Sequence, residues 1–451
     1  MKTDANDRGQ WSSKFGFVLA TSGSAIGLAN IWAFPYRTGQ NGGAAFVFVY
    51  LLCITFICLP FLFAELALGR FKHKNVIGTI RAIRPNGPWL GLGILCLAAG
   101  IFILSFYAVI AGWSFGFIFK MLFNDGSPFP AFASSPLLNI GLLLIFLCLT
   151  MAVVHEGVQY GIERWSKILM PTLLVLMIAL ILHGLTLPGA GDGLKFFLKP
   201  DFSKIDGKVI MAAMGQAFFS LSLGIGGILT YGSYLSKKEN IISAGISVAV
   251  LDTIIALMAG LMIFPALFSF GQAPNEGPAL VFIILPEIFR QLPFGNIIGA
   301  GFFVMLTIAA LTSAISMLEI SVAYFVDEKN WQRKKIVWIV GAFIFILGIP
   351  SALSSGAVPA LTSIGIFGGK SFLEIMIFLW FDIFPPLGAM LFCIFIGWVW
   401  GIDNAVEELG QGSPGFKQNF LGLPISGAKL WGFFIRYVCP LAIAIIWYNA
   451  I

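Results

Sequence analysis

Long apolar stretches, separated by short polar segments, follow one another along almost the whole chain. A helix needs about 20 predominantly apolar residues to cross the hydrocarbon core of a bilayer, and most of these stretches are at least that long. The pattern predicts eleven spans, near residues 15–38, 42–70, 88–123, 136–154, 165–187, 209–234, 241–271, 295–326, 335–352, 372–400 and 427–449. The sequence therefore predicts an all-α polytopic membrane protein. The polar segment before the first span does not resemble a cleaved signal, so we expect the mature protein to begin near Met1.

The composition supports a membrane protein and excludes other classes. Of the 451 residues, 58% are hydrophobic and only 11% are charged, which is about half the charge of a soluble domain. A water-soluble enzyme and a disordered chain are excluded, and no catalytic motif has its required context. The six cysteines lie inside apolar runs without metal-site spacing, so we expect buried free thiols.

The distribution of basic residues predicts the orientation. Segments on the side of the N-terminus carry about twice as many Lys and Arg residues as segments on the other side. We therefore expect a multi-pass protein of the plasma (inner) membrane with a cytoplasmic N-terminus and an external C-terminus. Because this bias also accounts for the net charge of +6, the basic residues do not imply a nucleic-acid partner. We expect the lipid bilayer to surround the protein.

The first and sixth spans are poorly suited to continuous helices. Small and polar residues gather in their middle, at Ser22, Gly23, Ser24, Gly27 and Asn30 and at Ser220, Ser222, Gly224, Gly226 and Gly227. Close helix packing through Gly23 and Gly27 is one interpretation. The other is a pair of broken helices that line a binding site, because unpaired backbone is tolerated at membrane depth only in such places.

The two breaks lie five spans apart, which is typical of transporters built from inverted repeats. On this basis residues 1–10 form a tail, 11–190 a first five-helix repeat and 205–400 a second, inverted repeat. Residues 401–451 then form an inner loop and the eleventh helix.

Six short segments carry a family resemblance: Ala25–Pro35, Asn41–Phe46, Glu65–Arg70, Gly215–Gly224, Glu276–Phe282 and Leu311–Ser313. In sequence and order they resemble the neurotransmitter:sodium symporter family, from Trp11 to the last span, and eleven spans are similar to its prokaryotic members. The resemblance implies sodium-driven import of an amino acid or a related small zwitterion by alternating access.

The resemblance also implies two sodium sites. The first takes the carbonyl of Ala25, the side chains of Asn30, Ser220 and Asp252, and the substrate carboxylate. The second takes the carbonyls of Gly23, Ile26 and Ala309 and the hydroxyls of Thr312 and Ser313. Taken alone, Thr312 and Ser313 are more typical of hydroxyls that bond to their own helix backbone, and only the matched pattern favours the sodium site. A sodium site completed by the substrate makes each ligand bind better in the presence of the other.

Asp252 is a carboxylate deep in the seventh predicted span, where a charge is costly and is by default functional. Animal members of the family have asparagine there and serine one turn later, and require chloride. This chain has Asp252 and Ala256, although Tyr50, Gln216 and Ser220 remain polar. We therefore expect chloride-independent transport; a purely structural pairing of Asp252 is the alternative.

The substrate pocket implied by the resemblance consists of Ala25, Leu28, Ala29, Ile103, Tyr107, Phe219, Ser220, Ser222, Ile225, Ser313 and Met317. Gly27 stands where monoamine carriers have an aspartate, so the substrate must supply its own carboxylate. The apolar lining predicts a neutral, apolar α-amino acid. Because Ala29 replaces a common glycine, a carrier of β- or γ-amino acids is the alternative, and a non-transporting amino-acid sensor is another.

Two gates follow from the same resemblance. Family members commonly close the outer gate with an arginine–aspartate pair, but the corresponding residues here are Ala33 and Ile377, so we expect closure on Tyr107 and Phe219. The inner gate is expected to use Arg8, Trp11, Ser233, Tyr234 and Asp327. The sequence assigns no role to Glu319, Glu374 and Asp382, and leaves the oligomeric state open.

Overall fold

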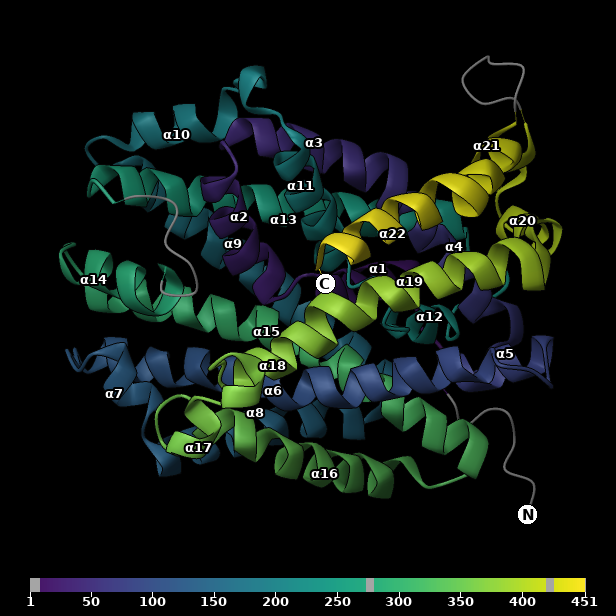
Figure 1. The fold of residues 1–451 in the computed structure, drawn as a ribbon, viewed down its shortest axis with the longest axis horizontal. Helices are drawn as coiled ribbons and strands as arrows, with labels where there is room; N and C mark the ends of the chain where they lie inside the picture. Colours follow the sequence, from purple (N-terminus) through teal and green to yellow (C-terminus); the bar gives the residue numbers. More distant parts are fainter. Residues whose placement is uncertain (1–8, 273–279, 419–425, 451) are drawn as a thin grey trace.

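The computed structural model in Figure 1 describes residues 9–272, 280–418 and 426–450, and the regular elements in these ranges are helices. The long helices lie alongside one another in the long direction of the molecule. The short helices α7 (Phe129–Ala133), α10 (Ala190–Leu198), α14 (Leu285–Arg290) and α17 (Pro359–Thr362) lie at one end, while α5 (Val76–Ile83), α20 (Ile402–Gly410) and α21 (Gly427–Phe433) lie at the other.

Nine helical segments of the described residues are long and apolar enough to cross a membrane. They are α3–α4 (Ala44–Lys72), α6 (Leu90–Leu122), α8 (Pro136–His155), α9 with its preceding π-turn (Val158–Leu185), α13 (Ile241–Ser269), α15 (Gly295–Lys329), α16 (Arg333–Leu353), α18–α20 (Phe372–Gly410) and α21–α22 (Gly427–Asn449). Each matches a predicted span. The segment Phe372–Gly410, which matches the tenth predicted span, continues beyond the predicted end at residue 400, because the chain resumes a helix after the positive φ of Gly401.

The two remaining predicted spans are broken, as their composition indicated. In the first, α1 (Lys14–Ala25) and the helical stretch Ala29–Gln40, which contains α2 (Phe34–Gln40), meet at an angle of 56°. In the sixth, α11 (Gly207–Ser220) and α12 (Gly227–Gly232) are separated by a non-helical turn. Ser222, Gly224 and Gly226 of this turn have φ of 51°, 84° and 83°, a region that only glycine enters without strain.

The breaks lie inside the bundle. Helix α15 packs against α1, α6, α8, α9 and α16, and α1 also packs against α9 and α13. The hydroxyl of Ser222 donates to the carbonyl of Ser24 at 3.3 Å, which joins the two breaks directly. The polar side chains of both breaks are therefore enclosed by helices, and not exposed to lipid.

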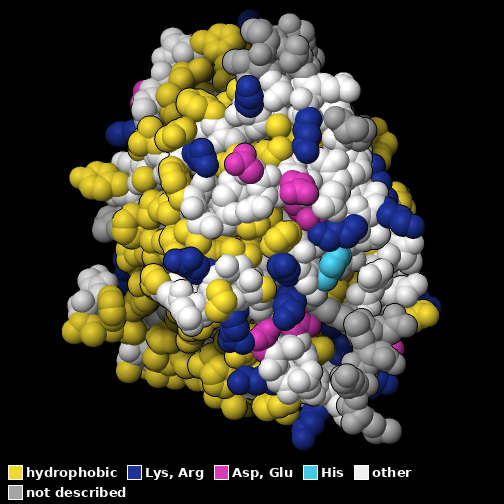
Figure 2. Space-filling model, turned by 90° about the vertical axis from the view of Figure 1, so that its right-hand side faces the viewer, with side chains coloured by type: hydrophobic (Ala, Val, Ile, Leu, Met, Phe, Trp, Pro, Cys, Tyr) yellow, Lys and Arg dark blue, Asp and Glu magenta, His cyan; other side chains and the backbone are white. Residues whose placement is uncertain are grey.

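The six cysteines are free thiols, five of them buried and Cys148 half-buried, as predicted. Basic side chains gather on the end that carries α5, α20 and α21, which faces the viewer in Figure 2. This end also receives the C-terminus of α15, because Arg81 of α5 pairs with Glu328. Basic residues lie at or beside the ends of α4 and α5 and at the beginning of α16: Lys72, Lys74, Arg81, Arg84, Lys334 and Lys335.

Candidate functional site

A fully buried polar cluster lies beside the first break. The side-chain amide of Asn30 donates to Oδ1 of Asp252 at 2.8 Å and to Oγ of Ser220 at 2.8 Å. Ser220 donates to Oδ2 of Asp252 at 2.7 Å and accepts from the Tyr50 hydroxyl at 3.1 Å. All four side chains have no exposed surface. We call these four residues the Asp252 cluster.

The first break places two further oxygen atoms beside this cluster, one from a side chain and one from the backbone. Oδ1 of Asn30 accepts from the amide of Gly27 at 3.3 Å, and the carbonyl of Ala29 accepts from Nε2 of Gln216 at 3.1 Å. A site that offers only oxygen ligands, with no thiolate or imidazole, is suited to hard cations. Among the described residues, no three His, Cys, Asp or Glu side chains come together as a metal group.

A second group of oxygens forms where α1 ends against α15. The Thr312 hydroxyl lies 3.0 Å from the carbonyl of Ala309 and 3.5 Å from that of Ile26. The Ser313 hydroxyl lies 3.2 Å from the carbonyl of Ile26 and 3.5 Å from that of Gly23. The five residues predicted for a second cation site are thus brought together, and we call them the Thr312 cluster.

Glycine at positions 23 and 27 allows this close approach. A Cβ on Gly23 lies 3.1 Å from Cβ of Thr312, so small-residue packing and the oxygen cluster occur at the same place. A Cβ on Gly27 lies 2.5 Å from Oγ of Ser313 and 2.9 Å from the hydroxyl of Tyr107. A side chain at Gly27, the position where the resemblance places the aspartate of monoamine carriers, would therefore displace the hydroxyl groups of Ser313 and Tyr107.

An apolar cavity of about 70 Å³ opens beside the second break, and we call it the Met317 cavity. Its lining is Ile103, Gly215, Phe218, Phe219, Ser222, Leu223, Ile225, Met317, Phe381, Pro385, Pro386 and Ile446. Five predicted pocket residues belong to it: Ile103, Phe219, Ser222, Ile225 and Met317. Ala29, Ser220 and Ser313 belong instead to the surrounding polar groups, and Ala25 is the buried last residue of α1.

A second cavity, of about 100 Å³, is separated from the first by two aromatic rings, and we call it the Arg37 cavity. Its lining is Leu28, Trp32, Ala33, Arg37, Phe106, Tyr107, Ile110, Phe219, Ile377 and Phe381. Phe219 and Phe381 line both cavities, with ring centroids 3.7 Å apart. The hydroxyl of Tyr107 accepts from the amide of Leu28 at 3.4 Å.

The sequence predicts closure on Tyr107 and Phe219, and the structure adds Phe381 to the boundary between the two cavities. The position of Phe381, four residues after Ile377 on the same helical segment, is the sequence signal that could have indicated it.

Ala33 and Ile377 both line the Arg37 cavity, so the two positions expected to have lost an ion pair do face a common space. Arg37, four residues after Ala33, lines the same cavity. Asp382 lies within electrostatic range of Arg37. Arg37 thus places a positive charge at this cavity, and the nearby carboxylate of Asp382, five residues after Ile377, acts on it electrostatically without a direct ion pair among the described residues.

At the opposite end of α1, Trp11 packs edge-on against Phe17, Tyr231 and Tyr234. Its indole nitrogen donates to the carbonyl of Tyr231 at 3.0 Å, and its amide donates to that of Tyr234 at 3.4 Å. Ser233, beside them, donates to the carbonyl of Thr230 at 2.6 Å. The structure thus gathers three residues of the predicted inner gate around the beginning of α1.

The other two predicted members of that gate are Arg8 and Asp327. Arg8 lies outside the described residues. Asp327 accepts from the backbone amide of Asn75 at 2.8 Å and from its side-chain amide at 3.1 Å. Asp327 therefore holds the end of α15 against α5.

Glu319 and Glu374 also find their environments. Glu319 is completely buried, pairs with Arg333 and accepts from the hydroxyl of Tyr234 at 2.6 Å. Glu374 forms a capping box with Ser371 at the N-terminus of α18. The first joins α15, α16 and the turn after α12, whose Tyr234 contacts Trp11, while the second only begins a helix.

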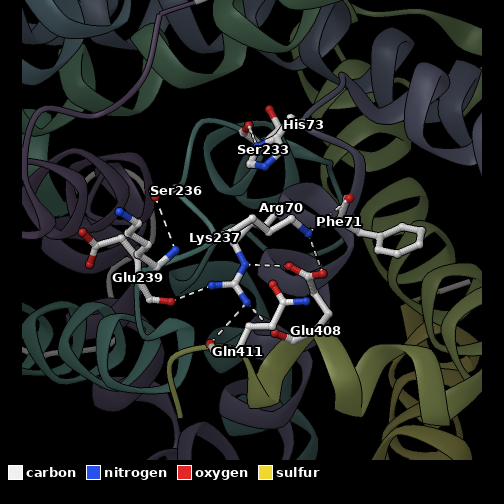
Figure 3. Close-up of polar contacts among 10 residues, drawn as sticks. Arg70, Phe71, His73, Ser233, Ser236, Lys237, Glu239, Glu408 and Gln411 are labelled. Carbon is white, nitrogen blue, oxygen red and sulfur yellow. Dashed lines mark hydrogen bonds and ion pairs between the residues drawn. The ribbon is translucent and has the colours of Figure 1, made fainter.

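A buried ion pair fastens α20 to the end of α4 (Figure 3). Nε of Arg70 donates to Glu408 at 2.7 Å, and Nη1 donates to the carbonyl of Glu239 at 2.6 Å. Lys237 donates to the other carboxylate oxygen of Glu408 at 2.7 Å. Arg70 has no exposed surface, so this network links three segments that are distant in sequence.

The comparisons with known proteins agree with this geometry. The model of the sodium:neurotransmitter symporter family matches residues 8–128 and 134–447. An uncharacterised sodium-dependent transporter of Bacillus subtilis, YhdH, is 41% identical over 98% of this chain and 97% of its own length. The sodium-dependent serotonin transporter of Drosophila melanogaster is 28% identical over 95% of this chain and 76% of its own length. The crystal structure of MhsT in complex with L-phenylalanine superposes with a TM-score of 0.87 at 43% identity, covering 98% of this chain and 100% of that one.

Proposed function

This chain belongs to the sodium:neurotransmitter symporter family, and we propose that it imports a neutral, apolar α-amino acid with sodium by alternating access. As a family member it is a sodium-dependent, multi-pass membrane transporter and not an enzyme. The observation that carries the proposal is the juxtaposition of the two helix breaks with the apolar Met317 cavity. MhsT, which is similar over nearly the whole chain, was crystallised with L-phenylalanine.

We assign one sodium to the Asp252 cluster and one to the Thr312 cluster. At the first, the carbonyl of Ala25 and the side chains of Asn30, Ser220 and Asp252 supply oxygens, and the substrate carboxylate completes the set. At the second, Gly23, Ile26 and Ala309 supply carbonyls, and Thr312 and Ser313 supply hydroxyls. Unwound helix ends provide such oxygens without added charge.

The polar end of the substrate is expected to lie between the two breaks. Its carboxylate accepts from the amides of the first break and from the hydroxyl of Tyr107, where the positive end of the half-helix favours an anion. Its ammonium group donates to the carbonyls of Ala25, Phe219 and Ser222. The apolar side chain then enters the Met317 cavity, where burial of hydrocarbon favours binding.

The carboxylate of Asp252 supports the proposal that transport is independent of chloride. It stands inside a buried cluster that also includes the hydroxyl groups of Ser220 and Tyr50. A fixed negative charge here balances a bound sodium, so a mobile anion is not needed.

Coupling to sodium supplies the energy for accumulation. With a tenfold gradient and 100 mV, two sodium ions provide roughly 7 kcal/mol, from about 2.3 kcal/mol per charge and about 1.4 kcal/mol per decade. We place the basic end of Figure 2 in the cytoplasm, with the N-terminus inside and the C-terminus outside the plasma membrane. Residues 11–190 and 205–400 then form the two inverted repeats, and Trp11, Ser233, Tyr234, Asp327 and Arg8 form the inner gate.

The test is uptake into proteoliposomes from a panel of radiolabelled α-, β- and γ-amino acids, with external sodium or potassium and with chloride or gluconate. We expect sodium-dependent uptake of apolar α-amino acids that gluconate does not reduce. Uptake only of β- or γ-amino acids overturns the substrate assignment, and loss of uptake in gluconate overturns chloride independence. Sodium-dependent binding without uptake identifies a sensor.

A further inference from the structure

A groove lies between α20 and the beginning of the last helical segment, at the basic end of the molecule and outside the transport site. It encloses about 350 Å³. Its lining is Ile402, Asp403, Val406, Ala428, Lys429, Gly432, Phe433, Arg436 and Tyr437. Neither the sodium clusters nor the gates use any of these residues.

Two cations and an aromatic ring point from one helix into this groove. Lys429, Phe433 and Arg436 stand at positions i, i+4 and i+7, which lie on one face of a helix. Arg436 is fixed at its base, because its Nε donates to the carbonyl of Gly397 at 3.0 Å. A Cβ on Gly397 lies 3.3 Å from Cγ of Arg436, so the small residue allows this close approach.

The charges of the groove are left without partners in the part of the chain that the structure describes. Neither Lys429 nor Arg436 forms an ion pair there, and the terminal nitrogens of Arg436 have no acceptor. Asp403 lies on the opposite wall and also has no ion pair among these residues. The groove therefore carries one net positive charge.

The aromatic side chains around the groove indicate that it opens where a membrane meets water. Trp398, Phe433 and Tyr437 surround it with side chains that are 51%, 54% and 56% exposed, and Trp398 contacts Tyr437 edge-on. Half-exposed aromatic residues are typical of the interfacial belt. At 1.5 Å per residue, the backbone of Arg436 lies about 10 Å further along the helix than that of Lys429. A long basic side chain at this position can extend back toward the lipid headgroups.

We propose that this groove binds the headgroup of an anionic phospholipid of the phosphatidylglycerol class. Lys429 and Arg436 hold the phosphodiester, which carries the one negative charge that the groove lacks. A headgroup hydroxyl donates to Asp403, and the acyl chains extend along Phe433 and Tyr437. Basic pockets between helices at a membrane surface recognise lipid headgroups in this way.

The experiment is native mass spectrometry of the full-length protein, released from detergent micelles that contain phosphatidylglycerol, phosphatidylethanolamine and phosphatidylcholine in equal amounts. We expect the wild-type protein to retain phosphatidylglycerol at least tenfold over phosphatidylcholine. The variant Lys429→Gln/Arg436→Gln is expected to lose this preference. The matched control, Lys334→Gln/Lys335→Gln, removes two exposed lysines from the same end and is expected to keep it.

Three further arms test the groove independently and separate the possible sources of binding. Lys429→Gln alone changes an exposed side chain and leaves the Gly397 contact intact, so it tests the groove even if the double variant does not fold; we expect at least a threefold loss of preference. Displacement of the lipid by millimolar inorganic phosphate overturns the proposal in favour of a free-anion site. Preferential retention of phosphatidylethanolamine that Asp403→Asn abolishes also overturns it, as does equal retention of phosphatidylglycerol by wild type and the double variant.

Discussion

Replacing Asp252 with asparagine removes one charge from the proposed first sodium site and almost nothing else. The side chain keeps its size, and an amide can still bond to Ser220 and Asn30, which now lie at 2.7 and 2.8 Å from the carboxylate. The cluster is completely buried, so water cannot replace the lost charge. The change therefore isolates the electrostatic contribution of Asp252.

Its magnitude follows from the charge separation. Two unit charges about 4 Å apart, with an effective dielectric constant of about 20, attract each other by about 4 kcal/mol. At about 1.4 kcal/mol per decade, sodium is expected to bind roughly a thousandfold more weakly to Asp252→Asn. A chloride ion near the Tyr50 and Ser220 hydroxyls can restore the balance, and Ala256→Ser adds a further hydroxyl one turn away. The double variant Asp252→Asn/Ala256→Ser is thus expected to recover sodium affinity to within about tenfold, in chloride only.

The assay is thermal stabilisation of purified protein by sodium titration at a fixed substrate concentration, in chloride or in gluconate, because a ligand of the folded state raises stability by mass action. Ala256→Ser alone is the matched control, and it should behave as wild type in both anions. Wild-type sodium affinity in Asp252→Asn, or a double variant indifferent to chloride, would refute the assignment of the charge to this site.

Three other perturbations test the structure. Glu408→Gln leaves the buried guanidinium of Arg70 uncompensated and is expected to destabilise the protein by about 3–5 kcal/mol. Denaturation in detergent measures this loss. The control Glu407→Gln changes an exposed neighbour and should alter stability by less than about 0.5 kcal/mol. Gly224→Ala would place a Cβ 2.3 Å from the carbonyl oxygen of Pro385, at a residue whose φ is 84°. We expect the free energy of unfolding to fall by about 3 kcal/mol, and an unchanged stability would contradict this. Arg37→Gln and Asp382→Asn should each weaken substrate binding about three- to tenfold, whereas the double variant should be no worse than either alone, because paired charges couple in a double-mutant cycle.

The spans and the two breaks could be predicted because their signals are local. Apolar length identifies a membrane helix, and serine, glycine and asparagine in its middle indicate where the helix stops. Ser222 and Gly224 fall in the turn for this reason. Short helices such as α5 and α10 gave no comparable signal, since they neither cross the membrane nor repeat a pattern long enough to detect.

Pairings across the bundle could not be predicted from the chain alone. Arg70 and Glu408 are 338 positions apart, and only the arrangement of α4 and α20 brings them into contact. Glu319 had no role until Tyr234 and Arg333 were placed beside it. In both cases the sequence shows the acidic residue, but it cannot predict the partner, because long-range packing of the helices brings the two together.

The geometry around Ser313 gives a physical reason for coupling between ion and substrate. Its hydroxyl lies within hydrogen-bond distance of the carbonyls of Ser24 and Ile26, while a Cβ on Gly27 would lie only 2.5 Å from the same oxygen. One side chain of α15 thus fixes the end of α1 and also closes the space next to Tyr107. Any shift of the first break that alters the Thr312 cluster must therefore move the amides proposed to hold the substrate. Because the same backbone serves both ligands, neither site can change its shape independently of the other, and reciprocal coupling follows.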